Sequence, residues 1–138
     1  MNQDQAIRHL RQANAIARAA MEAGHHPFGA LLVAPDGETV LLEQRNVDSV
    51  NHAEAVLARE AARLHPPALL WGCTLVTTVE PCAMCAGAIM HARVARVVFG
   101  ARDPKTGAAG SVVDLFAEAD GFLGTWLIPF GWFLAKLV

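Results

Sequence analysis

Apolar residues recur with a helical period near the start of the chain. Between residues 4 and 23 they follow a spacing of about 3.6 residues, which places them on one face of a helix. Asp4 can cap the start of this helix, and Gly24 can end it. The apolar positions are Ile7, Leu10, Ala13, Ile16, Ala17, Ala20 and Met21. The pattern therefore predicts one amphipathic helix with a solvated outer face.

After Gly24 the apolar residues form short continuous runs, which are typical of strands. Stretches with a helical period separate the later runs. The first two runs flank a tight turn at 35–37, so we expect a hairpin. From there on, strand and helix alternate. The elements predicted after the first helix are strands at 30–33 and 39–44, a helix at 52–64, a strand at 73–78, a helix at 82–93, a strand at 94–99 and a helix at 111–119. This order is typical of an α/β protein, a three-layer α/β/α sandwich with a mixed central sheet.

The last eighteen residues, 121–138, break this pattern. They carry one charge, Lys136, and their uncharged run 122–135 contains a proline and a glycine. That run is shorter than the roughly 20 residues that span a bilayer, so we expect no membrane segment. We predict one catalytic domain over 1–120 with an apolar tail of the same domain. The tail could form a buried helix, an oligomer contact or a lid over a pocket, or be an artefact.

One histidine and two cysteines stand at the starts of two predicted helices. Cys82 and Cys85 are three residues apart, so a helix places both sulfurs on one face, and Pro81 suits the start of that helix. The N–H groups and dipole at a helix start lower thiol pKa values, and zinc binds thiolates. His52 can supply a third ligand. Three protein ligands leave one position of a tetrahedral zinc open, which is typical of a catalytic site, and we expect one Zn²⁺ per chain.

Glu54 follows His52 by two positions, in the first turn of the same predicted helix. Zinc lowers the pKa of a water in the open position to roughly 7, and a nearby carboxylate can carry its proton to a substrate nitrogen. A redox pair of cysteines would need neither Pro81 nor the histidine and glutamate. A structural zinc site would need a fourth ligand, and Cys73 is more typical of the start of an apolar strand. The set therefore favours a catalytic metal site with Glu54 as proton carrier.

Further candidates for substrate contacts lie in two loops. Asn46 can both donate and accept hydrogen bonds, although a turn role is the better interpretation from the residue alone. His25 and His26 precede a strand, where histidines are more often surface or capping residues than ligands, and a pocket role stays open for His26. Phe28 offers a ring that could stack on a substrate ring.

Composition is that of a single globular domain. The chain has 138 residues, 54% of them hydrophobic and 17% charged, which suffices for a core and argues against disorder. Its three cysteines leave no disulfide pair once two bind metal, and the N-terminus has no signal-peptide pattern, so we expect a cytoplasmic protein. The net charge of −2 and the pI of about 6.3 argue mildly against a large RNA substrate.

The pattern H-x-E … P-C-x-x-C is the signature of zinc nucleobase deaminases. Here it is formed by His52, Glu54, Pro81, Cys82 and Cys85. Residues 5–118 resemble the cytidine-deaminase-like superfamily. The resemblance implies zinc held by the histidine and both cysteines, with Glu54 as proton shuttle in a hydrolysis that releases ammonia. It also implies substrate contacts by Asn46 and the Ala53 backbone, and a homodimer.

Within this superfamily the resemblance divides between two groups. Residues 26–30 and 51–54 are similar to guanine and other small-base or nucleoside deaminases. Residues 85–111 are similar to the tRNA adenosine deaminases that act on the wobble base. The tail lacks the charged final helix usual in the RNA enzymes.

Charge decides our choice between these groups. The cations available to an RNA substrate near the second metal helix are Arg93, Arg96, Arg102 and Lys105. Ordinary solvated charge explains them, so we favour a small-molecule substrate: a nucleobase, a nucleoside or a related aminated heterocycle. The alternatives are a tRNA wobble adenosine-to-inosine deaminase and, in another class, a non-catalytic structural-zinc interaction protein.

Overall fold

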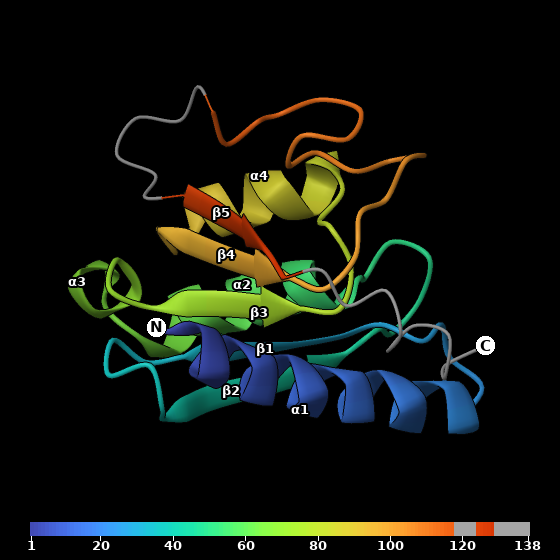
Figure 1. Cartoon of the computed structure of the whole chain (residues 1–138), viewed down its shortest axis with the longest axis horizontal. Helices are drawn as coiled ribbons and strands as arrows, with labels where there is room; N and C mark the ends of the chain where they lie inside the picture. Colours follow the sequence, from blue (N-terminus) through green and yellow to red (C-terminus); the bar gives the residue numbers. More distant parts are fainter. Residues whose placement is uncertain (118–123, 129–138) are drawn as a thin grey trace.

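A computed structural model of the protein describes residues 1–117 and 124–128 (Figure 1). Its elements are α1 (Gln3–Glu22), β1 (Gly29–Val33), β2 (Val40–Arg45), α2 (Ala53–Leu64), α3 (Pro67–Leu70), β3 (Thr74–Thr77), α4 (Ala83–His91), β4 (Arg96–Phe99) and β5 (Gly124–Leu127). The strands form one sheet in the order β2-β1-β3-β4-β5. β1 pairs antiparallel with β2 and β3, whereas β3, β4 and β5 run parallel. The predicted mixed sheet is therefore confirmed.

Helices cover both faces of this sheet, which explains why β1 is a continuous apolar run. Successive side chains of a strand point to opposite faces. Leu31 packs in the core beneath α1, while Leu32 packs in the core beneath α2 and α4. The approach of α1 to β1 is close, because a side chain at Gly29 would meet the carbonyl oxygen of Ala13 at 2.4 Å. The three layers of the predicted sandwich are present.

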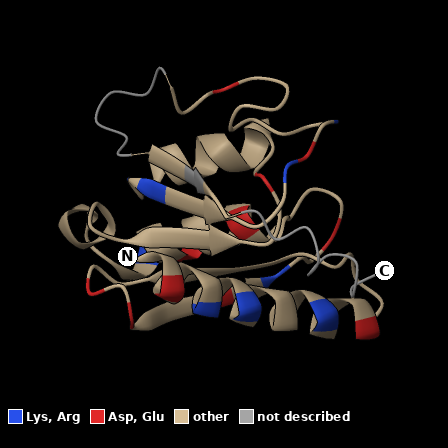
Figure 2. Cartoon of the chain, in the orientation of Figure 1, with Lys and Arg blue, Asp and Glu red and all other residues tan. Residues whose placement is uncertain are grey.

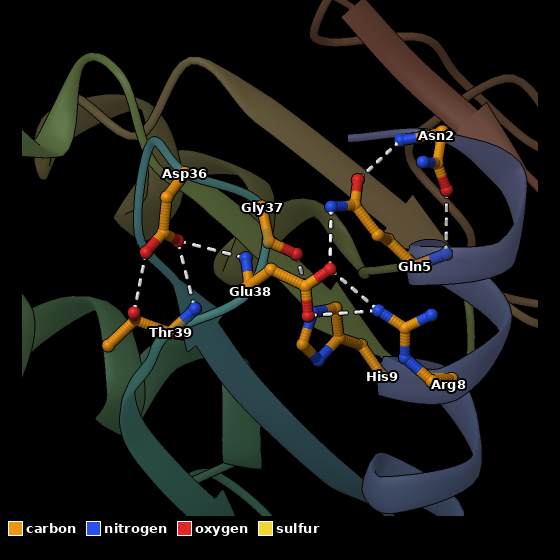
Figure 3. A network of polar contacts seen from close by, with 8 residues as sticks. All are labelled: Asn2, Gln5, Arg8, His9, Asp36, Gly37, Glu38 and Thr39. Atoms are coloured by element: carbon orange, nitrogen blue, oxygen red, sulfur yellow. Dashed lines mark hydrogen bonds and ion pairs between the residues drawn. The ribbon is translucent and has the colours of Figure 1, made fainter.

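Polar contacts fasten the start of α1 to the turn between β1 and β2 (Figure 3). The helix is capped by Asn2 and not by Asp4: the Asn2 side chain accepts from the Gln5 N–H at 2.9 Å, and the Asn2 N–H donates to the Gln5 side chain at 2.8 Å. The buried His9 ring places Nε2 2.9 Å from the Gly37 carbonyl oxygen. The His9 contact thereby joins α1 to the hairpin at the end where β1 stops and β2 begins.

Two segments differ from the prediction: residues 66–70, between α2 and β3, and residues 111–117, after β4. The proline pair at 66–67 ends α2 as expected, but it also opens the short α3, which the pattern did not predict. The helix predicted for 111–119 is wrong over its described part, 111–117. Ser111 caps no helix there, because its N–H and its hydroxyl both donate to the Glu80 carboxylate.

Part of the C-terminal tail completes the sheet. β5 lies beside β4 with Thr125 opposite Val97, and Ile128 is buried in the core beneath α1. Our expectations for residues 121–123 and 129–138 lie outside the described residues, and the division at residue 120 stays a prediction. Within the described ranges, no helix is both long and apolar enough to cross a membrane.

Candidate active site

Three candidate metal ligands meet where α2 and α4 begin. His52 is the N-cap of α2, Cys82 is the N-cap of α4, and Cys85 lies in the first turn of α4. His52 Nδ1 lies 3.7 Å from Cys82 Sγ and 3.6 Å from Cys85 Sγ. All three ligand atoms lie within 4.8 Å of one another. The fold thus brings together the three residues that the sequence singled out.

These spacings suit a tetrahedral zinc ion. Zn–S bonds of about 2.3 Å and Zn–N bonds of about 2.0–2.1 Å, at tetrahedral angles, place nitrogen and sulfur about 3.6 Å apart. The His52 ring is oriented by its other nitrogen, Nε2, which lies 3.0 Å from the Ser49 carbonyl oxygen. A proton on Nε2 leaves the lone pair of Nδ1 for the metal. One nitrogen and two sulfurs therefore fit zinc with a fourth position open.

The two thiols hold their protons unequally. A hydrogen bond from Cys85 lowers the pKa of Cys82 to about 5. The same contact, together with burial, raises the pKa of Cys85 above its ordinary value. Because zinc favours the thiolate of both, metal binding releases the remaining proton.

Glu54 lies beside the metal ligands, at the second residue of α2. Its side chain is buried, and burial raises its pKa. Thr77 Oγ1 donates a hydrogen bond of 2.8 Å to Glu54 Oε1, while Oε2 lies 3.7 Å from Cys85 Sγ. A carboxyl with a raised pKa, next to a metal site, is suited to exchanging protons near neutral pH.

Asn46 contributes a buried acceptor. Asn46 is 1% exposed, and its side-chain Nδ2 donates a hydrogen bond to the Asp48 carbonyl oxygen at 3.0 Å. That bond orients the amide, and Oδ1 finds no hydrogen-bond partner in the described part of the chain. Because an unsatisfied buried polar atom costs about 1–3 kcal/mol, this oxygen is suited to accept a hydrogen bond from a ligand. The substrate contact by Asn46 stays a prediction, for which this unpaired oxygen offers an acceptor.

A cavity of about 160 Å³ opens over these residues. Its lining consists of Phe28, Asn46, His52, Glu54, Val79, Glu80, Cys82, Asp103 and Thr106. His26 lies outside that lining and stacks on Phe28, with ring centroids 6.4 Å apart. Ala53 is fully buried and also lies outside it. The sequence pattern indicated five of the lining residues and missed Val79, Glu80, Asp103 and Thr106.

Two of the missed residues, Asp103 and Thr106, lie in a loop, 101–111, that the buried Glu80 carboxylate holds in place. Glu80 accepts hydrogen bonds from the backbone N–H groups of Asp103, Ala109 and Ser111 and from the Ser111 hydroxyl. Gly107 packs so closely that a side chain there would lie 2.5 Å from the Glu80 carboxyl carbon, and it forms a β-bridge with Cys82. The loop thereby becomes a wall of the cavity. In the sequence, the signals for this loop were its glycines and the resemblance of residues 85–111 to tRNA adenosine deaminases.

The four cations considered for RNA contacts separate into two pairs. Arg102 and Lys105 flank Asp103 in the loop that walls the cavity. Arg93 follows the C-terminal end of α4, and Arg96 opens β4, so both lie away from the helix starts that carry the metal ligands. Figure 2 shows charged residues of both signs on the loops near the helix starts.

Comparison with known proteins agrees with this geometry. The deaminases that this protein resembles are zinc hydrolases that act on C–N bonds, which is the class of enzyme predicted from the sequence. Residues 2–101 match the family model of the cytidine and deoxycytidylate deaminase zinc-binding region, and the chain belongs to this family. Zinc is its cofactor, and His52, Cys82 and Cys85 are the one group of described residues that can hold it.

Two curated relatives show how far the similarity extends. The tRNA-specific adenosine deaminase of Bacillus subtilis (strain 168) is 40% identical over 122 residues, which are 86% of this chain and 74% of that protein. The tRNA(Ile)-lysidine synthase of Deinococcus radiodurans is 42% identical over 120 residues, which are 84% of this chain. The chain spans only 21% of the length of that synthase.

Two solved structures share the fold. One comes from a study of A-to-I editing by tRNA:A34 deaminases at the wobble position. It has a TM-score of 0.79 and 32% identity, and the match covers 96% of this chain and 99% of that chain. The other is a guanine deaminase from Bacillus subtilis, with a TM-score of 0.60 and 34% identity over 74% of this chain and 66% of that chain. Both groups of the predicted resemblance are therefore represented.

Proposed function

We propose that this protein converts adenosine to inosine at the wobble position of a tRNA anticodon. The observation that carries the proposal is the extent of the structural match to a tRNA:A34 deaminase, which spans nearly the whole of both chains. The 40% identity to a tRNA-specific adenosine deaminase supports it as well. The RNA alternative thus has better support than the small-molecule substrate that we favoured from charge.

The side chains of the site suit this reaction. Water adds to C6 of adenine, the bond from C6 to the exocyclic nitrogen breaks, and inosine and ammonia form. When bound by His52, Cys82 and Cys85, zinc supplies the Lewis acidity that makes water a nucleophile near neutral pH. Glu54 takes a proton from the water, delivers it to N1 of the ring and transfers the next one to the departing amine. Asn46 Oδ1 accepts a hydrogen bond from the substrate.

Cavity size restricts what enters. At about 160 Å³ the cavity is smaller than the roughly 300–1,000 Å³ usual for drug-sized ligands. One heterocycle can enter, and the ribose and its neighbouring nucleotides stay outside. A base in the single-stranded anticodon loop reaches such a cavity at a low unstacking cost.

Three of the residues that line the cavity each have an exposed cation as their neighbour in sequence. The three cations are Arg45, Arg102 and Lys105. Phosphates of an anticodon loop can contact such side chains and fix the position of the target base. The net charge of −2 sums over all residues and so says little about these positions.

The test is deamination of an anticodon stem-loop carrying adenosine at the wobble position. A matched stem-loop carries its loop adenosine one position away, and free adenosine and guanine serve as small substrates. We expect inosine in the first RNA alone, with kcat/KM falling as salt rises because phosphate contacts are screened. Ammonia release from a small ring, with no inosine in the wobble stem-loop, would contradict the proposal.

A second candidate is deamination of guanine or a related free base. It is favoured by Phe28, whose ring lines the cavity within the stretch that is similar to guanine deaminases. The match to the Bacillus subtilis guanine deaminase structure supports it too. The guanine arm of the same assay tests it directly.

A homodimer and a cytoplasmic location stay predictions. Large apolar side chains near the start of α4 and after the 101–111 loop are exposed: Met84, Val112, Val113 and Leu115. A second subunit would remove them from water. Sedimentation equilibrium of the zinc-loaded protein gives the number of subunits.

A further inference from the structure

Thr77 is a buried polar residue that points toward the catalytic carboxylate. It ends β3, a central strand in which side chains alternate between the two cores. Leu75 lies in the core beneath α2 and α4, and Val76 lies in the core beneath α1. Thr77, two residues after Leu75, therefore faces α2, and it is completely buried. A fully buried hydroxyl in a core needs a partner, and here the partner is Glu54.

The hydroxyl has one proton to give and two acceptors within reach. Glu54 Oε1 lies 2.8 Å from Thr77 Oγ1, and the Gly29 carbonyl oxygen lies 3.5 Å away. The carboxylate is the closer acceptor and the one that can carry charge, so it takes the proton. This hydrogen bond holds Oε1 on the side of the carboxylate that faces β3. Oε2 is left facing the metal ligands, 3.7 Å from Cys85 Sγ.

We propose that Thr77 is a positioning residue, which fixes the Glu54 carboxylate with Oε2 toward the metal and the substrate. The last torsion of a glutamate side chain is broad, so the carboxylate plane turns readily unless a neighbour holds it. The carboxylate also accepts from the backbone N–H of Glu54 itself and from the Cys85 thiol at 3.7 Å, whose proton is lost when Cys85 binds zinc as a thiolate. With Cys85 as a thiolate, the strand hydroxyl is the donor from outside α2, among the described residues, that selects the reactive oxygen. The inference rests on the proton-carrying role proposed for Glu54 and not on which ring is deaminated.

The test compares two substitutions at this position. Thr77→Val replaces the hydroxyl by a methyl group of similar size, and Thr77→Ser keeps the hydroxyl. Thr74→Val is the matched control, since Thr74 is a buried threonine of the same strand that lies outside the cavity lining. We expect Thr77→Val to lower kcat roughly 10- to 100-fold, the loss typical of one hydrogen bond to a charged group, with KM changed less than about 3-fold. Thr77→Ser and Thr74→Val should keep most of kcat.

Readouts other than turnover separate positioning from damage to the fold. Zinc content and melting temperature of Thr77→Val should match those of Thr74→Val. A crystal structure of zinc-loaded Thr77→Val should show the Glu54 carboxylate rotated or in two orientations. If the valine variant does not fold, Thr77→Ala is assessed by the same kcat, zinc and crystallographic criteria.

Two results would overturn the inference. One is a Thr77→Val enzyme with kcat near that of the wild type, and the other is an unrotated Glu54 in its crystal structure. Activity of Glu54→Gln decides separately on the proton-carrying role proposed for Glu54. If that variant is inactive while Thr77→Val is fully active, only the positioning role fails, whereas an active Glu54→Gln removes the basis of both.

Discussion

His52 Nδ1 lies 3.6 Å from Cys85 Sγ, although 33 positions separate the two residues in the chain. Each stands at the start of a helix, and α2 and α4 pack on the same face of the sheet. The metal site therefore exists only when the sheet and both helices are in place. Zinc binding and folding should be coupled for the same reason.

The first prediction concerns metal content. The purified protein should hold about one zinc per chain, because three ligands and one water complete a tetrahedral site. Cys85→Ala should lose the metal and melt at a lower temperature, while Cys73→Ala should keep it, since the Cys73 thiol lies outside the metal group. Mass spectrometry of the native protein and thermal melts measure both. Stoichiometric zinc in Cys85→Ala would mean that the ligands are misassigned.

The second prediction concerns Glu54. The substitution Glu54→Gln removes the proton carrier and leaves all three ligands, so it should keep zinc and the fold. Turnover should fall roughly 10²- to 10⁴-fold, the usual contribution of general acid–base catalysis. Glu22→Gln, at an exposed position near the end of α1, is the matched control. Loss of zinc in Glu54→Gln would instead make Glu54 a ligand.

The third prediction concerns the Glu80 carboxylate, which holds the cavity wall. In Glu80→Gln an NH₂ group replaces one acceptor oxygen and faces backbone N–H donors of the loop. We expect a loss of about 1–3 kcal/mol in the free energy of unfolding and a higher KM, because the wall formed by Asp103 and Thr106 loosens. Urea unfolding and steady-state kinetics measure the two effects. Unchanged stability and KM would show that the loop is held by other contacts.

The pKa of Glu80 predicts how the stability of the fold should change with pH. Burial alone would raise its pKa, but the hydrogen bonds from Ser111, Asp103 and Ala109 outweigh burial and lower it below the ordinary 4.5. A carboxyl whose pKa is lower in the folded protein than in the unfolded chain stabilises the fold at pH values above its unfolded-state pKa. This contribution is lost as the pH falls through its folded-state pKa. The wild type should therefore lose more stability below about pH 4.5 than Glu80→Gln does.

The fourth prediction concerns the tail. Truncation after Asp120 removes β5 and the buried Ile128, so β4 becomes an unpaired edge beside an opened core. The shortened protein should melt at a lower temperature or aggregate. Light scattering and thermal melts detect either outcome. A truncated protein with the melting temperature and oligomeric state of the full chain would show that this strand is dispensable.

Local patterns were sufficient for most of the fold and for the metal ligands. Helix periodicity and breakers such as Gly24 and the proline pair at 66–67 act within a few residues, so the sequence displays them directly. His52, Cys82 and Cys85 were found because helix starts and ligand chemistry are also local properties.

What the sequence hid depends on contacts between distant segments. β5 is a strand because β4 offers a free edge beside Gly124–Leu127, whose own pattern does not alternate. Ser111 looked like a helix cap, but Glu80, 31 positions earlier, takes its hydrogen bonds. Thr77 was missed for the same reason, since its partner Glu54 lies on another element.

The most direct test of the central claim uses water labelled with oxygen-18. Zinc-loaded protein is incubated in it with the wobble-adenosine stem-loop, and the nucleosides are analysed by mass spectrometry while ammonia is measured. We expect inosine at the wobble position with one heavy oxygen and one ammonia per inosine, and roughly 10²- to 10⁴-fold slower formation of both products with Glu54→Gln. Unchanged adenosine in the stem-loop, together with ammonia from guanine or another small ring, would contradict the proposed substrate. Equal product from Glu54→Gln would contradict the mechanism.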